Sequence, residues 1–135
     1  MLPSQPPRTP RILIVEDHAD TRQMYAAFLS ASFEVIEAAD GNEALAAARE
    51  HRPDAIVTDM SLPGMDGFEL IQQLRREGAT KDTAVLCLSG FSGERHEERA
   101  REAGCDRVVQ KPCLPDALAE AIAIALAEHR DRSRS

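Results

Sequence analysis

The sequence predicts an α/β domain in three layers, with a parallel five-stranded sheet between two layers of helices. Short apolar runs rich in β-branched residues alternate five times with segments of helical spacing. The connections between them are short, as parallel strands joined by right-handed crossovers require. A length of 135 residues and a hydrophobic content of 43% suit one domain with a single core.

The sheet is expected to begin after an arm. Residues 1–10 hold four of the eight prolines and few apolar groups, which indicates a flexible, exposed segment. We place the domain at residues 11–129. Its first strand is the apolar run at 12–15, typical of a strand buried on both faces, and two acids follow it, Glu16 and Asp17.

Helical spacing marks the segments between the first three strands. Within residues 20–31, four side chains share one helical face and are expected in the core: Met24, Tyr25, Phe28 and Leu29. A second short strand is predicted at 33–37. After a turn at 40–41, residues 42–51 form an alanine-rich helix that Pro53 closes.

The third strand leads directly to an isolated acid. Its apolar run at 55–57 is followed by Asp59, so this carboxylate is expected at the carboxyl edge of the sheet, where open α/β sheets bind ligands. The turn residues Pro63 and Gly67 come next. A helix then runs to about Gly78, with one apolar face formed by Phe68, Leu70, Ile71 and Leu74.

The fourth strand is predicted at 83–88 and ends at Ser89. The segment 93–103 is helical in propensity but poor in apolar side chains. It offers the core only a few residues: Ala100 and Ala103, with Phe91 just before it. We therefore expect this helix to be weakly anchored, because burial of so little area contributes only about a few kcal/mol.

A short fifth strand at 108–109 leads to Lys111. The last helix is predicted from one apolar face, formed by Leu114, Leu118, Ile122 and Leu126. The charged tail at 130–135 lacks apolar residues and is expected to fray.

Composition excludes several classes of function. A net charge of −7 argues against a nucleic-acid-binding face. Three cysteines without metal-site spacing (Cys87, Cys105 and Cys113) indicate reduced thiols in the cytoplasm. The longest apolar run, 121–127, is far shorter than the ~20 residues of a membrane span, and no export signal opens the chain.

The four histidines are read as surface residues: His18, His51, His96 and His129.

Polar side chains follow four of the predicted strands. They are Glu16 and Asp17, then Asp59, then Ser89, then Lys111. Because the carboxyl ends of parallel strands share one edge of the sheet, we expect these five side chains to converge. Three carboxylates in one place repel each other, at about 4 kcal/mol for each pair 4 Å apart in a medium of effective dielectric near 20.

A divalent cation would offset this repulsion. Hard oxygen ligands without a nearby histidine or cysteine suit Mg²⁺ or Mn²⁺. The Lys111 ammonium and the Ser89 hydroxyl suit the oxygens of an incoming phosphoryl group. The set therefore indicates phosphoryl transfer to a carboxylate nucleophile.

These residues carry a resemblance to a known family. The acidic pair Glu16-Asp17, the D-x₃-P-x₃-G run from Asp59 to Gly67, Ser89 and the pair Lys111-Pro112 are each weak signals, but their joint placement is specific. Over residues 11–128 the chain resembles the receiver domains of two-component response regulators. The resemblance implies a flavodoxin-like fold with strand order 2-1-3-4-5.

The resemblance also implies a role for each residue. Asp59 would be the phosphoacceptor. The metal ligands would be Glu16, Asp17, Asp59 and the backbone carbonyl of Ser61. Lys111 and Ser89 would bind the phosphoryl group, and the peptide before Pro112 is a candidate for the cis form.

One position departs from the family. Where receivers usually have Tyr or Phe, three residues before the lysine, this chain has Val108. A valine cannot move a large ring between an exposed and a buried pocket. We therefore hypothesise that the signal passes through the segment 91–103, where a phosphoryl group would change order or orientation.

The expected partners are a histidine kinase or a histidine phosphotransfer protein, and an unknown downstream protein. We expect a monomer or weak dimer that acts as a stand-alone receiver, without nucleic-acid or membrane binding and without turnover of a substrate as an enzyme. A receiver fragment of a hybrid kinase is an alternative. An aspartyl-nucleophile phosphohydrolase is less favoured, because such enzymes usually need an acid where this chain has Ser61. A nucleotide or flavin binder would need a glycine-rich loop after the first strand.

Overall fold

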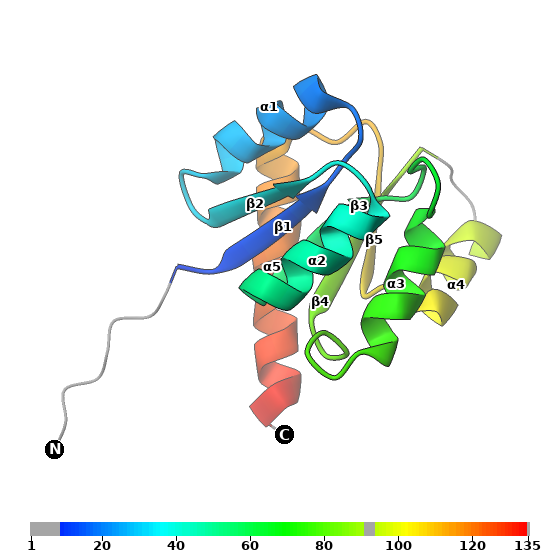
Figure 1. Ribbon diagram of the computed structural model, residues 1–135. Coiled ribbons are helices and arrows are strands. Elements are labelled where there is room, and N and C mark those ends of the chain that lie inside the picture. The colour runs from blue at the N-terminus through cyan, green and yellow to red at the C-terminus, as the bar shows by residue number, and fades with distance from the viewer. Residues whose placement is uncertain (1–8, 91–93, 135) are drawn as a thin grey trace, which may run out of the picture.

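A computed structural model describes residues 9–90 and 94–134. The described chain alternates five strands with five helices (Figure 1). The strands are β1 (Arg11–Val15), β2 (Glu34–Ala38), β3 (Ala55–Asp59), β4 (Ala84–Ser89) and β5 (Arg107–Gln110). The helices are α1 (Ala19–Leu29), α2 (Gly41–His51), α3 (Gly67–Arg76), α4 (Glu94–Ala103) and α5 (Pro115–Arg134).

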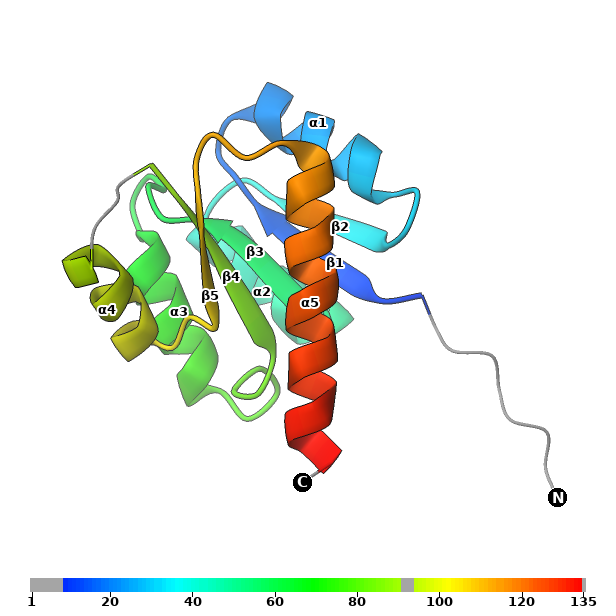
Figure 2. The same cartoon turned by 180° about the vertical axis from the view of Figure 1, so that it is seen from behind.

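All neighbouring strands are parallel, in the order β2-β1-β3-β4-β5. Helices α1 and α5 cover one face of this sheet, and α2, α3 and α4 cover the other (Figures 1 and 2). The predicted flavodoxin-like fold in three layers is therefore confirmed. The strand order places β1, β3 and β4 in the middle, where both faces are covered.

Alternating side chains of the central strands build two apolar layers, because successive residues of a strand point to opposite faces. On the side of α1 and α5, the layer includes Ile12, Ile14, Val57, Leu86, Leu118 and Ile122. On the side of α2, α3 and α4, it includes Leu13, Ile56, Leu70, Ile71, Val85 and Cys87. These aliphatic side chains are almost completely buried, which fixes the register of the sheet and therefore the position of every strand end.

Arg75 holds the amino ends of β4 and β5. From the last turn of α3, its guanidinium donates to the carbonyl oxygens of Lys81, Thr83 and Gly104 at 2.6–3.0 Å. It also pairs with the Asp106 carboxylate at 2.9 Å, and that carboxylate in turn accepts the Val85 N–H at 2.8 Å. One side chain therefore connects α3 to the loops that enter two strands.

Several sequence predictions need correction. Met24 and Phe28 are 45% and 47% exposed, whereas α1 buries Tyr25, Ala26 and Leu29. The buried face of α1 therefore includes the small Ala26, and it lies beside the face predicted from Met24 and Phe28. Leu114 precedes α5 and is 71% exposed.

Both ends of the domain also differ from expectation. The charged tail does not fray at 130, since α5 continues through Arg134. The arginines of this last stretch have high helix propensity. Most of the predicted arm at 1–10 lies outside the described residues, but the Pro10 carbonyl already accepts the Glu34 N–H at 2.9 Å. No helix in residues 9–90 and 94–134 combines the length and apolar character needed to cross a membrane.

Candidate functional site

The carboxyl edge of the sheet brings together the side chains that the sequence singled out. Backbone hydrogen bonds continue the strand pairing just beyond the strands: Glu16 N–H to the Ala38 carbonyl at 3.0 Å, and Lys111 N–H to the Ser89 carbonyl at 2.7 Å. Within the sheet, Asp59 lies opposite Leu88 in the register. The apolar strands thus fix the backbone positions of the polar residues that follow them.

Asp59 is 5% exposed, and both of its carboxylate oxygens are engaged. Oδ2 accepts from Lys111 Nζ at 2.6 Å, and Oδ1 accepts from the Ser61 N–H at 3.0 Å. Lys111 reaches Asp59 across 52 positions of sequence because β3 and β5 both flank β4. The geometry therefore presents a buried carboxylate paired with one ammonium group.

Three acids lie close enough to share a cation. Ligand oxygens of Glu16, Asp17 and Asp59 all lie within 4.8 Å of one another. Glu16 Oε2 is buried and has no hydrogen-bond partner among the described residues. Asp17, in contrast, is exposed to solvent. An orphaned buried carboxylate oxygen beside two further carboxylates fits a hard divalent ion such as Mg²⁺. The metal-ligand role of the Ser61 carbonyl stays a prediction.

The titration behaviour of the site follows from this crowding. Burial, with the adjacent Asp59 carboxylate, raises the pKa of Glu16 to about 8. Burial also acts to raise the pKa of Asp59, but hydrogen bonds from Glu16 and Lys111 outweigh it and hold that pKa below its usual range. Burial acts to lower the pKa of Lys111, and its hydrogen bond to Asp59 outweighs this, so the Lys111 pKa is raised. The crowding thus favours the protonated form of Glu16 and the ionised form of Asp59.

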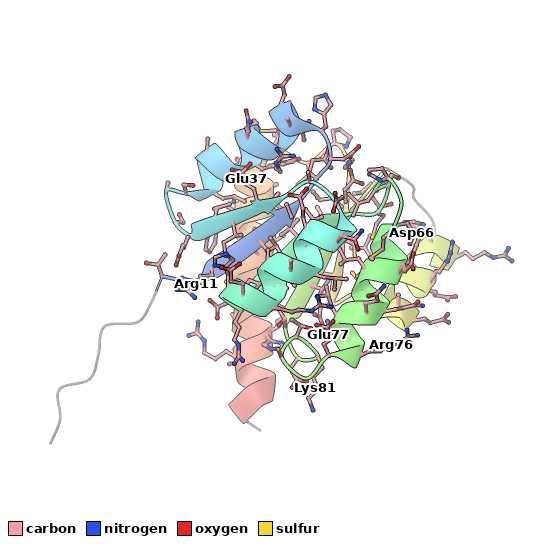
Figure 3. The ribbon with its side chains drawn as sticks, viewed as in Figure 1. Arg11, Glu37, Asp66, Arg76, Glu77 and Lys81 are labelled. Atoms are coloured by element: carbon pink, nitrogen blue, oxygen red, sulfur yellow. The ribbon has the colours of Figure 1, made fainter. Side chains whose placement is uncertain are left out.

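The loop after Asp59 bends around Pro63, which is exposed. Gly67, predicted as a turn residue, is instead the first residue of α3, after the N-cap Asp66. A Cβ at Gly67 would lie 2.7 Å from Met60 Cα and 2.9 Å from the Asp59 carbonyl oxygen, so only glycine lets α3 start this close to the site. Figure 3 shows Asp66 at one end of α3 and Arg76 with Glu77 at the other.

Sequence reasoning missed one neighbour of the site. His96 on α4, expected at the surface, is half-buried, and its Nε2 forms a 2.6 Å hydrogen bond with Ser89 Oγ. Ser89 itself is 1% exposed at the end of β4. A lone histidine in a polar helix carries no sequence signal for such a contact, which only the packing of α4 against β4 creates. His18 caps α1 through its side chain.

Other predicted positions are found as follows. The Lys111-Pro112 peptide bond is cis, the form that the resemblance implied. Val108 is half-buried and packs against the apolar layer beneath α2, α3 and α4. Ala100 and Ala103 are the buried apolar residues of α4, as predicted, whereas Phe91 lies outside the described residues.

Comparison with known proteins agrees with this geometry. The family model described as response regulator receiver domain matches residues 12–123. The polar-differentiation response regulator DivK of Brucella anthropi is 35% identical over 102 residues, which cover 75% of this chain and 83% of DivK.

Solved structures give the same result. The chemotaxis response regulator CheY4 of Vibrio cholerae is 32% identical, with a TM-score of 0.83 over 87% of this chain and 99% of that chain. A CheY-like receiver domain protein from Methanospirillum hungatei is 26% identical, with a TM-score of 0.85 over 93% of this chain and 99% of that chain. The family match over residues 12–123 and the similarity to DivK agree with the fold and with the acids and lysine at the edge of the sheet. The chain therefore belongs to the response regulator receiver domain family.

Proposed function

We propose that this receiver accepts a phosphoryl group on Asp59 from the phosphohistidine of a histidine kinase or histidine phosphotransfer protein. The observation that carries the proposal is the buried Asp59 carboxylate, which is held ionised and paired with Lys111 at 2.6 Å. An ionised carboxylate is the nucleophile that such a transfer needs.

In the transfer, an Asp59 carboxylate oxygen attacks phosphorus. The new O–P bond forms as the N–P bond of the phosphohistidine breaks, and the imidazole leaves with that electron pair. Lys111 Nζ already contacts Asp59 and would pair with the phosphoryl oxygens, which carry most of the charge. Ser89 would donate its hydroxyl proton to one of them. The product is an acyl phosphate on this chain.

A divalent ion, Mg²⁺ or Mn²⁺, would be held by Glu16, Asp17 and Asp59, with the Ser61 carbonyl as a further ligand. When bound, it would supply the positive charge that offsets three carboxylates and the incoming phosphoryl group. The orphaned Glu16 Oε2 supports this assignment.

The phosphorylated protein would change a surface that an unidentified downstream protein binds, and we propose no turnover of a separate substrate. We place the protein in the cytoplasm as a monomer or weak dimer. The thiols Cys87, Cys105 and Cys113 are all free, which suits a reducing compartment.

Intact mass after treatment with acetyl phosphate and Mg²⁺ tests the chemistry. Wild type should gain the mass of one phosphoryl group, and Asp59→Asn should gain none. Asp82→Asn, which changes an exposed acid before β4 at the opposite edge of the sheet, should behave as wild type. A wild type that gains no mass, or a gain that persists in Asp59→Asn, would refute the assignment. Sustained hydrolysis of phosphate esters would favour a phosphohydrolase instead.

A further inference from the structure

A continuous set of contacts leads from Ser89 into the layer of α3 and α4. Ser89 Oγ and His96 Nε2 are joined at 2.6 Å. The His96 ring meets the Phe68 ring of α3 edge-on, with centroids 5.6 Å apart and planes at 77°. The Arg99 guanidinium lies 4.2 Å from the centroid of the same Phe68 ring, a cation–π contact. His96 is therefore held by a hydrogen bond on one side and by an aromatic ring on the other.

Strand alternation shows which way Ser89 faces. In β4, Val85 and Cys87 point into the layer under α2, α3 and α4, and Ser89 continues that alternation. In β3, Ala55 and Val57 point to the opposite face, toward α1 and α5. Asp59 continues the alternation of those two residues. The hydroxyl that contacts His96 thus lies on the α4 side of the sheet, away from the side that Asp59 follows.

A single torsion separates the two positions of the hydroxyl. Rotation about the Cα–Cβ bond of Ser89 moves Oγ among three staggered wells. Because Asp59 follows the other side of the sheet, contact with a phosphoryl group on Asp59 would favour a well other than the one that meets His96. The hydrogen bond to His96 therefore competes with the bond to the phosphoryl group.

We propose that His96 is a positioning residue that holds Ser89 toward α4 until the phosphoryl group on Asp59 displaces it. The inference rests on the function proposed above and adds the residue that sets the balance between the two positions of Ser89. In β5, Gln110 pairs with Ser89 and Val108 pairs with Cys87. Val108 carries no large ring that could follow the serine, and the side-chain contact of Ser89 described above is the one with His96 of α4.

The consequence reaches the surface. Release of His96 removes a tie between α4 and the end of β4, and the buried apolar side chains of α4 are only Ala100 and Ala103 among the described residues. Phe68 and Arg99 line a groove between α3 and α4. Phosphorylation would thus alter the packing at that groove.

The test uses beryllium fluoride with Mg²⁺ as a stable mimic of the phosphoryl group, titrated into the full chain and followed by amide NMR. His96→Phe keeps an aromatic ring against Phe68 and removes the hydrogen bond. Its affinity for beryllium fluoride should exceed that of wild type by about two- to tenfold, the equilibrium change that one intramolecular hydrogen bond produces. His96→Gln, whose amide can still bond Ser89, should stay near wild type.

Two controls separate this role from general loosening of the helix. His51→Phe, at an exposed histidine of α2, should leave the affinity unchanged. In a Ser89→Ala background, His96→Phe should have no effect, because the competing bond is already absent. In the wild-type background, His96→Ala also removes the hydrogen bond and should, like His96→Phe, raise the affinity for beryllium fluoride.

The outcomes are distinct. An unchanged or lower affinity in both His96→Phe and His96→Ala would overturn the role of His96, as would an equal gain in the Ser89→Ala background. If wild type itself did not bind beryllium fluoride with Mg²⁺, the proposed function would fail, and this inference with it.

Discussion

Replacement of Glu16 by glutamine should stabilise the metal-free protein at alkaline pH. Folding raises the pKa of Glu16 from 4.5 to about 8, because the carboxyl group is buried beside Asp59. A carboxyl group whose pKa is raised binds its proton more tightly in the folded state. Its stabilising contribution is therefore fully present below pH 4.5 and is lost as the pH rises to about 8.

The structure sets the size of this effect. The difference between the two pKa values corresponds to at most about 5 kcal/mol at pH well above 8. Local relaxation and water reduce this, and we expect about 2–4 kcal/mol. The stability that Asp59 contributes through its lowered pKa is fully present above its unfolded pKa of 3.8 and is lost only at lower pH. The stability that Lys111 contributes through its raised pKa is fully present below its unfolded pKa of 10.5. The interval from pH 5 to 8.5 therefore reports on Glu16 rather than on these two groups.

Urea unfolding of metal-free protein at pH 5, 7 and 8.5 measures the effect. Glu16→Gln should match wild type at pH 5 and exceed it by the expected amount at pH 8.5. Glu120→Gln, at an exposed position of α5, is the matched control and should show no such trend. Saturating Mg²⁺ should stabilise wild type by about 2.7 kcal/mol at 100 times its dissociation constant, and Glu16→Gln by less. A difference between Glu16→Gln and wild type that stays constant with pH would refute the reasoning.

Two further predictions concern the framework around the site, each measured by urea unfolding. Gly67→Ala should lower the free energy of unfolding by about 1–3 kcal/mol, because its Cβ would meet the Met60 backbone. Gly78→Ala, with open space around it, should be nearly neutral. Equal effects of the two substitutions would contradict the close approach of α3 to the Met60 backbone. Arg75→Met should lower the free energy of unfolding by about 2–4 kcal/mol, because its hydrogen bonds to backbone carbonyls are lost. Arg76→Met, at an exposed position of the same turn, should lower it by about 0.5 kcal/mol or less. Similar losses in the two variants would show that the Arg75 contacts do not stabilise the fold.

The fold could be predicted because its signal is local. Each strand is a short apolar run, and the run at 12–15 that is buried on both faces can be read without knowledge of its neighbours. The convergence of Glu16, Asp59 and Lys111 then follows from topology, since parallel strands end at one edge. Neither step needs the details of packing.

The errors arose where packing decides. The burial of α1 through Ala26, with Met24 and Phe28 left exposed, depends on how closely the helix approaches the sheet. The contact between His96 and Ser89 depends on the position of α4, which a polar sequence does not report. Such contacts are set by the assembled layers and leave no periodic trace in the chain.

Arg75 connects the amino ends of β4 and β5, whereas the three acids and Lys111 lie at the carboxyl ends of the strands. The stabilising contacts of Arg75 and the residues of the candidate phosphorylation site thus lie at opposite edges of the sheet. Substitutions around Arg75 therefore change contacts at the edge of the sheet opposite to Asp59. At the other edge, the repulsion among the acids is offset locally, by the Lys111 ammonium beside Asp59.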